Sequence, residues 1–217
     1  ARESLASIFY NKTFKLDYDK NVIERNFELI KFALDLPFNR EEIHHKLPFL
    51  HSSQQHLTSS LSNIKKNILL IPGASHLSKC YPISKLAKLT TLIDANFLII
   101  WGNHNEKIMA DEIKALSPEV KVCDKLSLPV LISLINEVDL VIGPDTGPTH
   151  MAWALNRASI TIFGPTPSYR NTYVTDINQV IKSSSSVNPY KIDNKDESIK
   201  DISVEKILQI VNKLLKL

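Results

Sequence analysis

Within residues 138–155, the tight turn at 143–150 combines an acid, a histidine, two threonines, two glycines and two prolines. The apolar, mainly β-branched residues 138–142 predict a buried parallel strand, and the residues after Pro148 follow a helical pattern. Asp145 or Thr146 is a suitable N-cap, and Pro148 suits the first turn of a helix. Free backbone N–H groups and the positive end of the helix dipole both point into such a turn. We therefore predict that a diphosphate binds here.

Two side chains of this stretch each have a structural and a functional interpretation. A carboxylate repels a diphosphate, so Asp145 either caps the helix or holds sugar hydroxyl groups close to the phosphates, and the two roles are compatible. His150 lies about one and a half turns into the helix. It either donates a hydrogen bond to phosphate or is a hydrogen-bonded core histidine. Taken alone, the pattern favours the core interpretation of His150.

A second loop, residues 72–80 (PGASHLSKC), follows another apolar run. Its small residues allow a ligand close to the backbone, Ser75 and Ser78 offer hydroxyl groups, and Lys79 offers a positive charge. Such a lysine would neutralise a leaving diphosphate. The alternative is a solvated lysine on an ordinary strand-to-helix loop. The loop is not a Walker loop, because it lacks the GKS or GKT ending.

A third loop, residues 101–106 (WGNHNE), places Glu106 just beyond a predicted strand. A carboxylate in this position accepts hydrogen bonds from ribose hydroxyls in dinucleotide-binding folds. The structural alternative is a first-turn glutamate that the helix dipole favours, and alone it is the better interpretation.

The elements that must position these loops alternate along the chain, which predicts an α/β fold with a parallel sheet. Strands are expected at 67–71, 97–100, 120–122, 138–142, 159–163 and 180–181, and helices at 84–93, 106–116, 127–136 and 203–215, with a further helix in the second half of the unit at 138–155. Ligands bind beyond the carboxyl ends of such strands. Residues 1–60 lack the alternation; we expect a helix over 22–34 and a short strand near Phe49.

Composition limits the functional classes. The chain has 217 residues, 43% hydrophobic and 23% charged, as in ordinary globular proteins. A net charge of +3 suits phosphate-bearing ligands and is too small and dispersed to indicate nucleic acid. Two cysteines indicate a reducing compartment rather than a disulfide framework. The histidines of residues 44–56 lack the cysteines or paired acids of a metal site. Because the chain opens on Ala1, we expect the native N-terminus to lie upstream.

Together, the loops resemble the ADP-heptose lipopolysaccharide heptosyltransferases, glycosyltransferase family 9, and most of all the heptosyltransferase I members. The resemblance covers nearly the whole chain and rests on PGASHLSKCYP (72–82), WGNHNE (101–106), KLSLP (125–129), GPDTGPTHMAWAL (143–155) and ITIFGPTP (160–167). It departs from the family at two points. Ala74-Ser75 stands where a pair of hydroxyl residues is common, and Leu126 stands where methionine is common.

The resemblance implies a GT-B glycosyltransferase, with two Rossmann-like domains and the active site between them. Residues 1–62 would be the tail of the N-terminal acceptor domain with a connector, and residues 63–217 the C-terminal domain that binds the nucleotide sugar. Carried over by position, Lys79 would stabilise the leaving group. The donor site would comprise Ser75, Lys79, Glu106, Leu126, Asp145, Thr146, Gly147 and His150. The family's proposed base is an aspartate in a glycine-rich loop that this sequence lacks, so we expect the chain alone to bind donor without transfer.

The activity implied is inverting transfer of L-glycero-D-manno-heptose from ADP-heptose to the Kdo residue of the lipid A inner core. No metal or other cofactor is expected. Such an enzyme would be cytoplasmic and peripheral to the inner membrane, without a nucleic-acid partner. The alternatives are heptosyltransferase II, which adds heptose to heptose, a non-catalytic sugar-nucleotide-binding module, and a UDP-sugar enzyme of the same fold. We further expect residues 1–20 either to dock on the second domain or another copy, or to be mobile.

Overall fold

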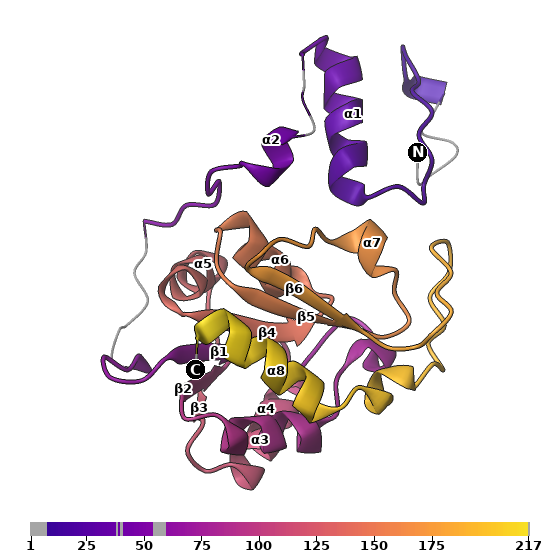
Figure 1. The fold of residues 1–217 in the computed structure, drawn as a ribbon. Coiled ribbons are helices and arrows are strands. Elements are labelled where there is room, and N and C mark those ends of the chain that lie inside the picture. The colour runs from indigo at the N-terminus through magenta and orange to yellow at the C-terminus, as the bar shows by residue number, and fades with distance from the viewer. Residues whose placement is uncertain (1–7, 38, 40, 54–59, 217) are drawn as a thin grey trace.

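A computed structural model describes residues 8–37, 39, 41–53 and 60–216. Its centre is a six-stranded parallel sheet with helices on both faces (Figure 1). The strands are β1 (Asn67–Leu70), β2 (Asn96–Ile99), β3 (Lys121–Val122), β4 (Leu140–Pro144), β5 (Ser159–Phe163) and β6 (Asn178–Lys182). Their order across the sheet is β3-β2-β1-β4-β5-β6. The predicted Rossmann-like α/β fold is therefore confirmed.

The strand order reverses between β1 and β4, which lie side by side with Leu70 next to Ile142. The loops that follow these two strands consequently leave the sheet at the same point. In open parallel sheets this switch point is where ligands bind. It is also where the sequence places the lysine loop and the acid-containing turn.

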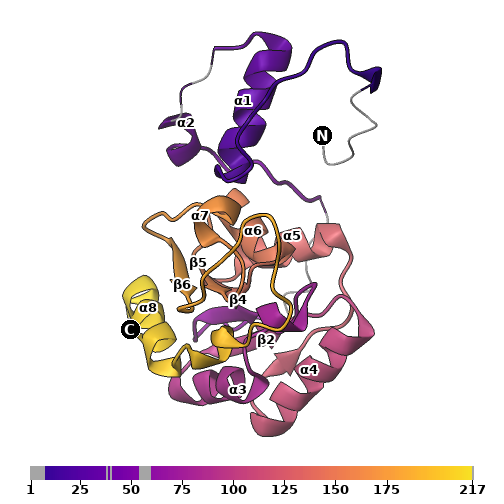
Figure 2. The ribbon, with the colours of Figure 1, turned by 90° about the vertical axis from the view of Figure 1, so that its right-hand side faces the viewer.

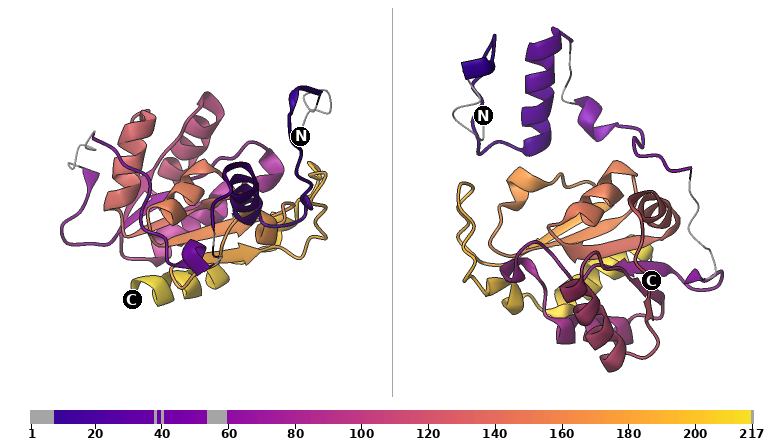
Figure 3. Two further views of the ribbon diagram at one scale, coloured as in Figure 1. Left: turned by 90° about the horizontal axis from the view of Figure 1, so that it is seen from above. Right: turned by 180° about the vertical axis from the view of Figure 1, so that it is seen from behind.

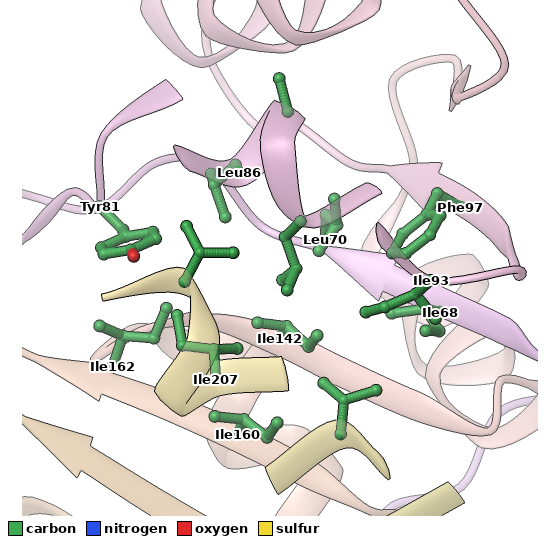
Figure 4. Close-up of a cluster of buried hydrophobic side chains, with 14 of the residues drawn as sticks. Ile68, Leu70, Tyr81, Leu86, Ile93, Phe97, Ile142, Ile160, Ile162 and Ile207 are labelled. Carbon is green, nitrogen blue, oxygen red and sulfur yellow. The ribbon is translucent and has the colours of Figure 1, made fainter. Parts of the chain in front are cut away.

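Helices cover the two faces in separate groups. One face carries α3 (Ile83–Leu92), α4 (His104–Leu116) and α8 (Val204–Leu215), and the other carries α5 (Leu128–Glu137) and α6 (Gly147–Ala154). The central strands β1, β2 and β4 supply both faces, because successive side chains point to opposite sides. On β1, Ile68 and Leu70 join the α3 and α8 side, whereas Leu69 joins the α5 and α6 side. Figure 4 shows Ile68 and Leu70 in the first cluster, with Ile207 of α8.

The chain before the sheet contains α1 (Val22–Leu34) and α2 (Glu41–His44), which lie together beyond one end of the sheet, near α6 and α7 (Figures 1, 2 and 3). A small cluster joins the two parts: Ile43 and Trp153 are buried, and Ile23 and Phe27 pack against them. The side chain of Asn21 caps α1 and also donates to the carbonyl groups of Tyr169 and Thr172, at 2.9 and 3.0 Å.

Tyr18, in the segment before α1, also contacts Arg170 of α7 and Tyr190 in the loop after β6. The guanidinium of Arg170 lies 4.0 Å from the ring of Tyr18, and Tyr18 stacks on Tyr190 at 5.4 Å between ring centroids. Ile8 and Phe9 are 75% and 85% exposed. Docking thus applies to the residues next to α1, whereas residues 1–7 lie outside the described part of the chain.

Most predicted elements are present, with small shifts at their ends. Helix α4 begins at His104 rather than at 106, because the side chain of Asn103 caps it. The short strand expected near Phe49 is wrong: residues 41–53 contain no strand, and the Phe49 N–H donates to the carbonyl of Ala154. The sequence did not predict four short helices, which are α2, α7 (Ser168–Asn171) and the 3₁₀ helices η3 (Leu77–Lys79) and η4 (Ser198–Asp201).

Candidate functional site

The carboxylate of Asp145, directly after β4, is the centre of a buried polar cluster. Asp145 is 6% exposed. Its Oδ1 lies 3.1 Å from Nε2 of His150, and its Oδ2 lies 3.0 Å from Nζ of Lys79. The Thr166 hydroxyl and the Asn171 amide also donate to Oδ2, at 3.1 and 3.0 Å. A buried carboxylate is costly unless it is paired and hydrogen-bonded, so these four partners explain how the acid is accommodated.

These partners keep Asp145 ionised. Burial alone would raise the pKa of its carboxyl group. The hydrogen bond and charge of His150 and the charge and hydrogen bond of Lys79 outweigh burial, so the pKa lies well below its ordinary value. The site therefore holds a fixed negative charge beside a fixed positive one.

Lys79 ends η3 in the loop after β1 and is 8% exposed. Among the described residues Asp145 is its one ion-pair partner. An ammonium group has three N–H donors, so two remain for other acceptors. Lys79 lines a cavity of about 710 Å³ that also contains Asp145 and Ser75. The interpretation of Lys79 as a solvated surface lysine is therefore wrong.

The first turn of α6 opens onto the same cavity. Thr146, and not Asp145, is the N-cap, and its backbone N–H points to the Thr149 hydroxyl at 3.4 Å. A Cβ added to Gly147 would meet nothing within 4 Å, so a ligand has access to this turn. Thr146 and Gly147 both line the cavity. Asp145 is therefore not the cap of this helix. Its carboxylate instead pairs with the side chains of Lys79 and His150.

His150 also lies at the cavity wall. Its side chain is 37% exposed and its Nε2 faces Asp145. The core interpretation that the pattern alone favours is therefore wrong for His150. Trp153, one helical turn further along, is 9% exposed and belongs to the buried cluster at α2, yet it too contributes to the cavity.

The structure adds residues to this cavity that the sequence did not single out. They come from α7 and the residue after it, and from the start of α1 and the segment after α2. They include Val22, Ile23, Phe49, Leu50, Arg170, Asn171 and Thr172. No local motif marks these positions, because only the docking of α1 and α7 over the end of the sheet brings them together.

Glu106 lines a second cavity of about 440 Å³. Ser75 lines both cavities, so the two adjoin. One oxygen of Glu106 accepts from the Gly102 N–H at 2.6 Å. A Cβ on Gly73 would lie 2.2 Å from Cγ of Glu106, so glycine at this position lets the glutamate lie across the loop. Glu106 is thus a first-turn acid of α4 that also reaches a cavity, which fits both interpretations.

Four further residues, Leu126, Ser78, Ser75 and Cys80, have different surroundings. Leu126 is half-buried against the α5 and α6 side of the core and is not among the residues that line these two cavities. The Ser78 hydroxyl is buried and has no hydrogen-bond partner among the described residues, whereas Ser75 is exposed. Burial raises the pKa of the Cys80 thiol, and the opposing effect of the Lys79 charge is smaller.

Within the described residues, no group of three His, Cys, Asp or Glu side chains is arranged to hold a metal ion. The helices in this part of the chain are too short or too polar to cross a membrane.

Comparison with known proteins identifies relatives of this arrangement. The family model described as glycosyltransferase family 9 (heptosyltransferase) matches residues 1–200. Lipopolysaccharide heptosyltransferase 1 of Campylobacter coli is 40% identical over 98% of the chain and 67% of its own length. Lipooligosaccharide heptosyltransferase 2 of Haemophilus influenzae is 25% identical over 93% of the chain and 64% of its own length.

A solved structure shares the fold. The heptosyltransferase WaaC of E. coli with ADP has a TM-score of 0.74 and 20% identity, and the match covers 99% of this chain and 63% of that one. The same protein with ADP-2-deoxy-2-fluoro heptose has a TM-score of 0.70. The chain spans about half to two thirds of the length of the curated relatives that it matches.

Proposed function

The chain belongs to glycosyltransferase family 9, the heptosyltransferases, and we propose that it forms the nucleotide-sugar-binding part of an enzyme that transfers heptose from ADP-heptose. The buried Lys79–Asp145 pair beside the open first turn of α6 carries the proposal. Residues 63–217 are assigned to the donor-binding domain and residues 1–62 to the tail of the acceptor domain and a connector.

The two adjoining cavities suit the parts of a nucleoside diphosphate sugar. The diphosphate would lie against Lys79, the Ser75 hydroxyl and the N–H group of Gly147, next to Thr146, where the helix dipole adds positive potential. The ribose would lie at Glu106 in the second cavity. Leu126 is assigned to the adenine side, which the family resemblance supports and which no contact in this structure supports.

Asp145 would bind the sugar through one oxygen. Its Oδ2 already accepts from three donors, whereas Oδ1 has His150 as its single donor among the described residues. A carboxylate oxygen has two lone pairs, so Oδ1 has capacity for one hydroxyl of the heptose. His150, half-exposed beside Oδ1, would lie against the sugar or the nearer phosphate.

The chemistry required of these residues is stabilisation of a departing diphosphate. The acceptor hydroxyl would form a bond to the anomeric carbon as the bond to ADP breaks, with inversion through an oxocarbenium-like state. Negative charge then grows on the β-phosphate, where Lys79 and the N-terminus of α6 already stand. These groups supply the positive charge that a metal supplies elsewhere, so we propose that no metal cofactor takes part. No residue of this chain is proposed as the base.

For the acceptor, we propose the Kdo residue of the lipid A inner core. The greater identity to a heptosyltransferase 1 than to a heptosyltransferase 2, 40% against 25%, supports Kdo over heptose. Because that acceptor is a lipid, we further propose a cytoplasmic enzyme in peripheral contact with the inner membrane. Transfer assays of the full-length enzyme with the two acceptors distinguish these alternatives.

Calorimetric titration of this chain with ADP and with UDP tests the donor site. We expect ADP to bind more tightly than UDP, and Lys79→Ala to weaken ADP binding. Lys88→Ala is the matched control, because Lys88 of α3 forms an exposed ion pair with Glu205 of α8, outside both cavities. Equal binding of the two nucleotides would contradict ADP specificity, and equal affinity of the two alanine variants would contradict the role of Lys79.

A further inference from the structure

We propose that Thr166 and Asn171 are positioning residues of the donor site, which hold Oδ2 of Asp145 so that the carboxylate keeps Lys79 and His150 directed at the cavity of about 710 Å³. The inference rests on the proposed function, because it concerns the residues that would bind the sugar diphosphate. Neither residue follows from the loop motifs of the sequence.

Asp145 needs anchoring because its end torsion is soft. The χ2 of aspartate has broad, roughly two-fold minima, so a single ion pair does not fix the plane of the carboxylate. Here Oδ2 accepts from Lys79, Thr166 and Asn171 together, all within 3.1 Å. Donors from β1's loop and from the two segments after β5 therefore converge on one oxygen. This leaves Oδ1 directed at His150.

The amide of Asn171 has one orientation that satisfies its neighbours. Arg170 Nη1 donates to its Oδ1 at 2.9 Å, and a guanidinium has only donors to offer. The Nδ2 group must then face Asp145, as it does. Arg170 is itself held by Tyr18, whose carbonyl accepts from Nε at 2.9 Å and whose ring lies 4.0 Å from the guanidinium carbon. The segment before α1 thereby supports the orientation of Asn171.

Thr166 separates positioning from direct binding. It is 4% exposed, it follows β5 by three residues, and it is not among the residues that line the cavity of about 710 Å³. Thr166 would therefore affect a ligand in that cavity indirectly, through the position of the Asp145 carboxylate. Asn171 lines the cavity itself, so its substitution mixes the two effects.

The test compares Thr166→Val, which keeps the shape and removes the hydroxyl, with Thr166→Ser, which keeps the hydroxyl. Thr161→Val is the matched control: Thr161 lies on β5, is 3% exposed and is not a partner of Asp145. Two quantities are measured, namely ADP affinity by calorimetry and the pKa of the Asp145 carboxyl group by carbon-13 NMR. A purely structural role would not produce a pKa change that the serine variant reverses.

We expect Thr166→Val to raise the pKa of Asp145 and to weaken ADP binding about tenfold, because it removes a hydrogen bond to a charged group. Thr166→Ser and Thr161→Val should match wild type in both measurements. If Thr166→Val does not fold, Asn171→Leu should show the same direction of pKa change.

Equal carboxyl pKa values in the valine and serine variants would overturn the inference, and so would a raised pKa with unchanged ADP affinity. Failure of the wild type to bind ADP would instead refute the proposed function. In that case the carboxyl titration alone still decides whether Thr166 positions Asp145.

Discussion

Replacing Asp145 by asparagine tests the buried ion pair most directly. The substitution keeps the size of the side chain but removes the negative charge from beside Lys79, which is 8% exposed. It also puts an amide NH₂ group where an oxygen accepted hydrogen bonds. Both carboxylate oxygens face donors. The NH₂ group of the new amide must therefore point either at His150 or at the three donors to Oδ2, which are Lys79, Thr166 and Asn171.

Breaking a buried ion pair on one side costs about 3–5 kcal/mol, because the remaining charge is left without compensation. For a chain of this length, each kcal/mol lowers Tm by about 2–4 °C, so we expect a loss of about 6–20 °C. Lys79→Met leaves Asp145 with three donors and should also destabilise. In the double variant no buried charge remains, so its cost should fall short of the sum of the single variants by about 1–3 kcal/mol.

Urea denaturation of the wild type, both single variants and the double variant gives this coupling free energy, provided that the m-value stays constant. The exposed pair Lys88–Glu205, with side chains 55% and 62% exposed, provides the control cycle. There we expect a coupling of at most about 1 kcal/mol. Additive costs at Lys79 and Asp145, within about 0.5 kcal/mol, would refute the claim that the two side chains act as a buried pair.

Three further predictions concern single positions. The low pKa of Asp145 gives stability that is complete above the pKa of an unfolded carboxyl, about 3.9, and is lost as the pH falls toward the lower folded value, because the unfolded chain takes up the proton first. In a series of urea denaturations at different pH values, Asp145→Asn should reduce the dependence of the unfolding free energy on pH below about 4. An unchanged dependence would contradict the low pKa of Asp145. Gly73→Ala should displace Glu106, because the new Cβ would lie 2.2 Å from Cγ of Glu106. We expect this variant and Glu106→Gln both to weaken ADP binding. Wild-type affinity for ADP in both variants would show that Glu106 does not bind the nucleotide. Burial raises the pKa of Cys123 to about 11, so mass spectrometry should find it alkylated more slowly than the half-buried Cys80, and faster labelling would contradict that burial.

The sequence predicted the central strands and most of the longer helices, because burial of these elements produces local patterns of apolar residues. Strands β1, β2 and β4 are buried on both faces, so each is an unbroken or nearly unbroken apolar run. Helix α8 buries one stripe and therefore shows a clear helical period. Four-residue helices such as α2 and α7 are too short to have a period.

The sequence by itself determined which loops carry polar residues after buried strands, because both the apolar runs and the polar turns are local patterns. That these loops bind a phosphate-bearing ligand stays a prediction. The sequence did not determine what Asp145 does. Its partners Thr166 and Asn171 lie 21 and 26 residues away along the chain, and Lys79 comes from another loop. Only the pairing of β4 with β1 and β5, and the docking of α7 over their ends, brings these groups to one carboxylate. The tertiary structure decided this network, because hydrogen bonds and ion pairs depend on distance in space, and local sequence patterns do not encode that distance.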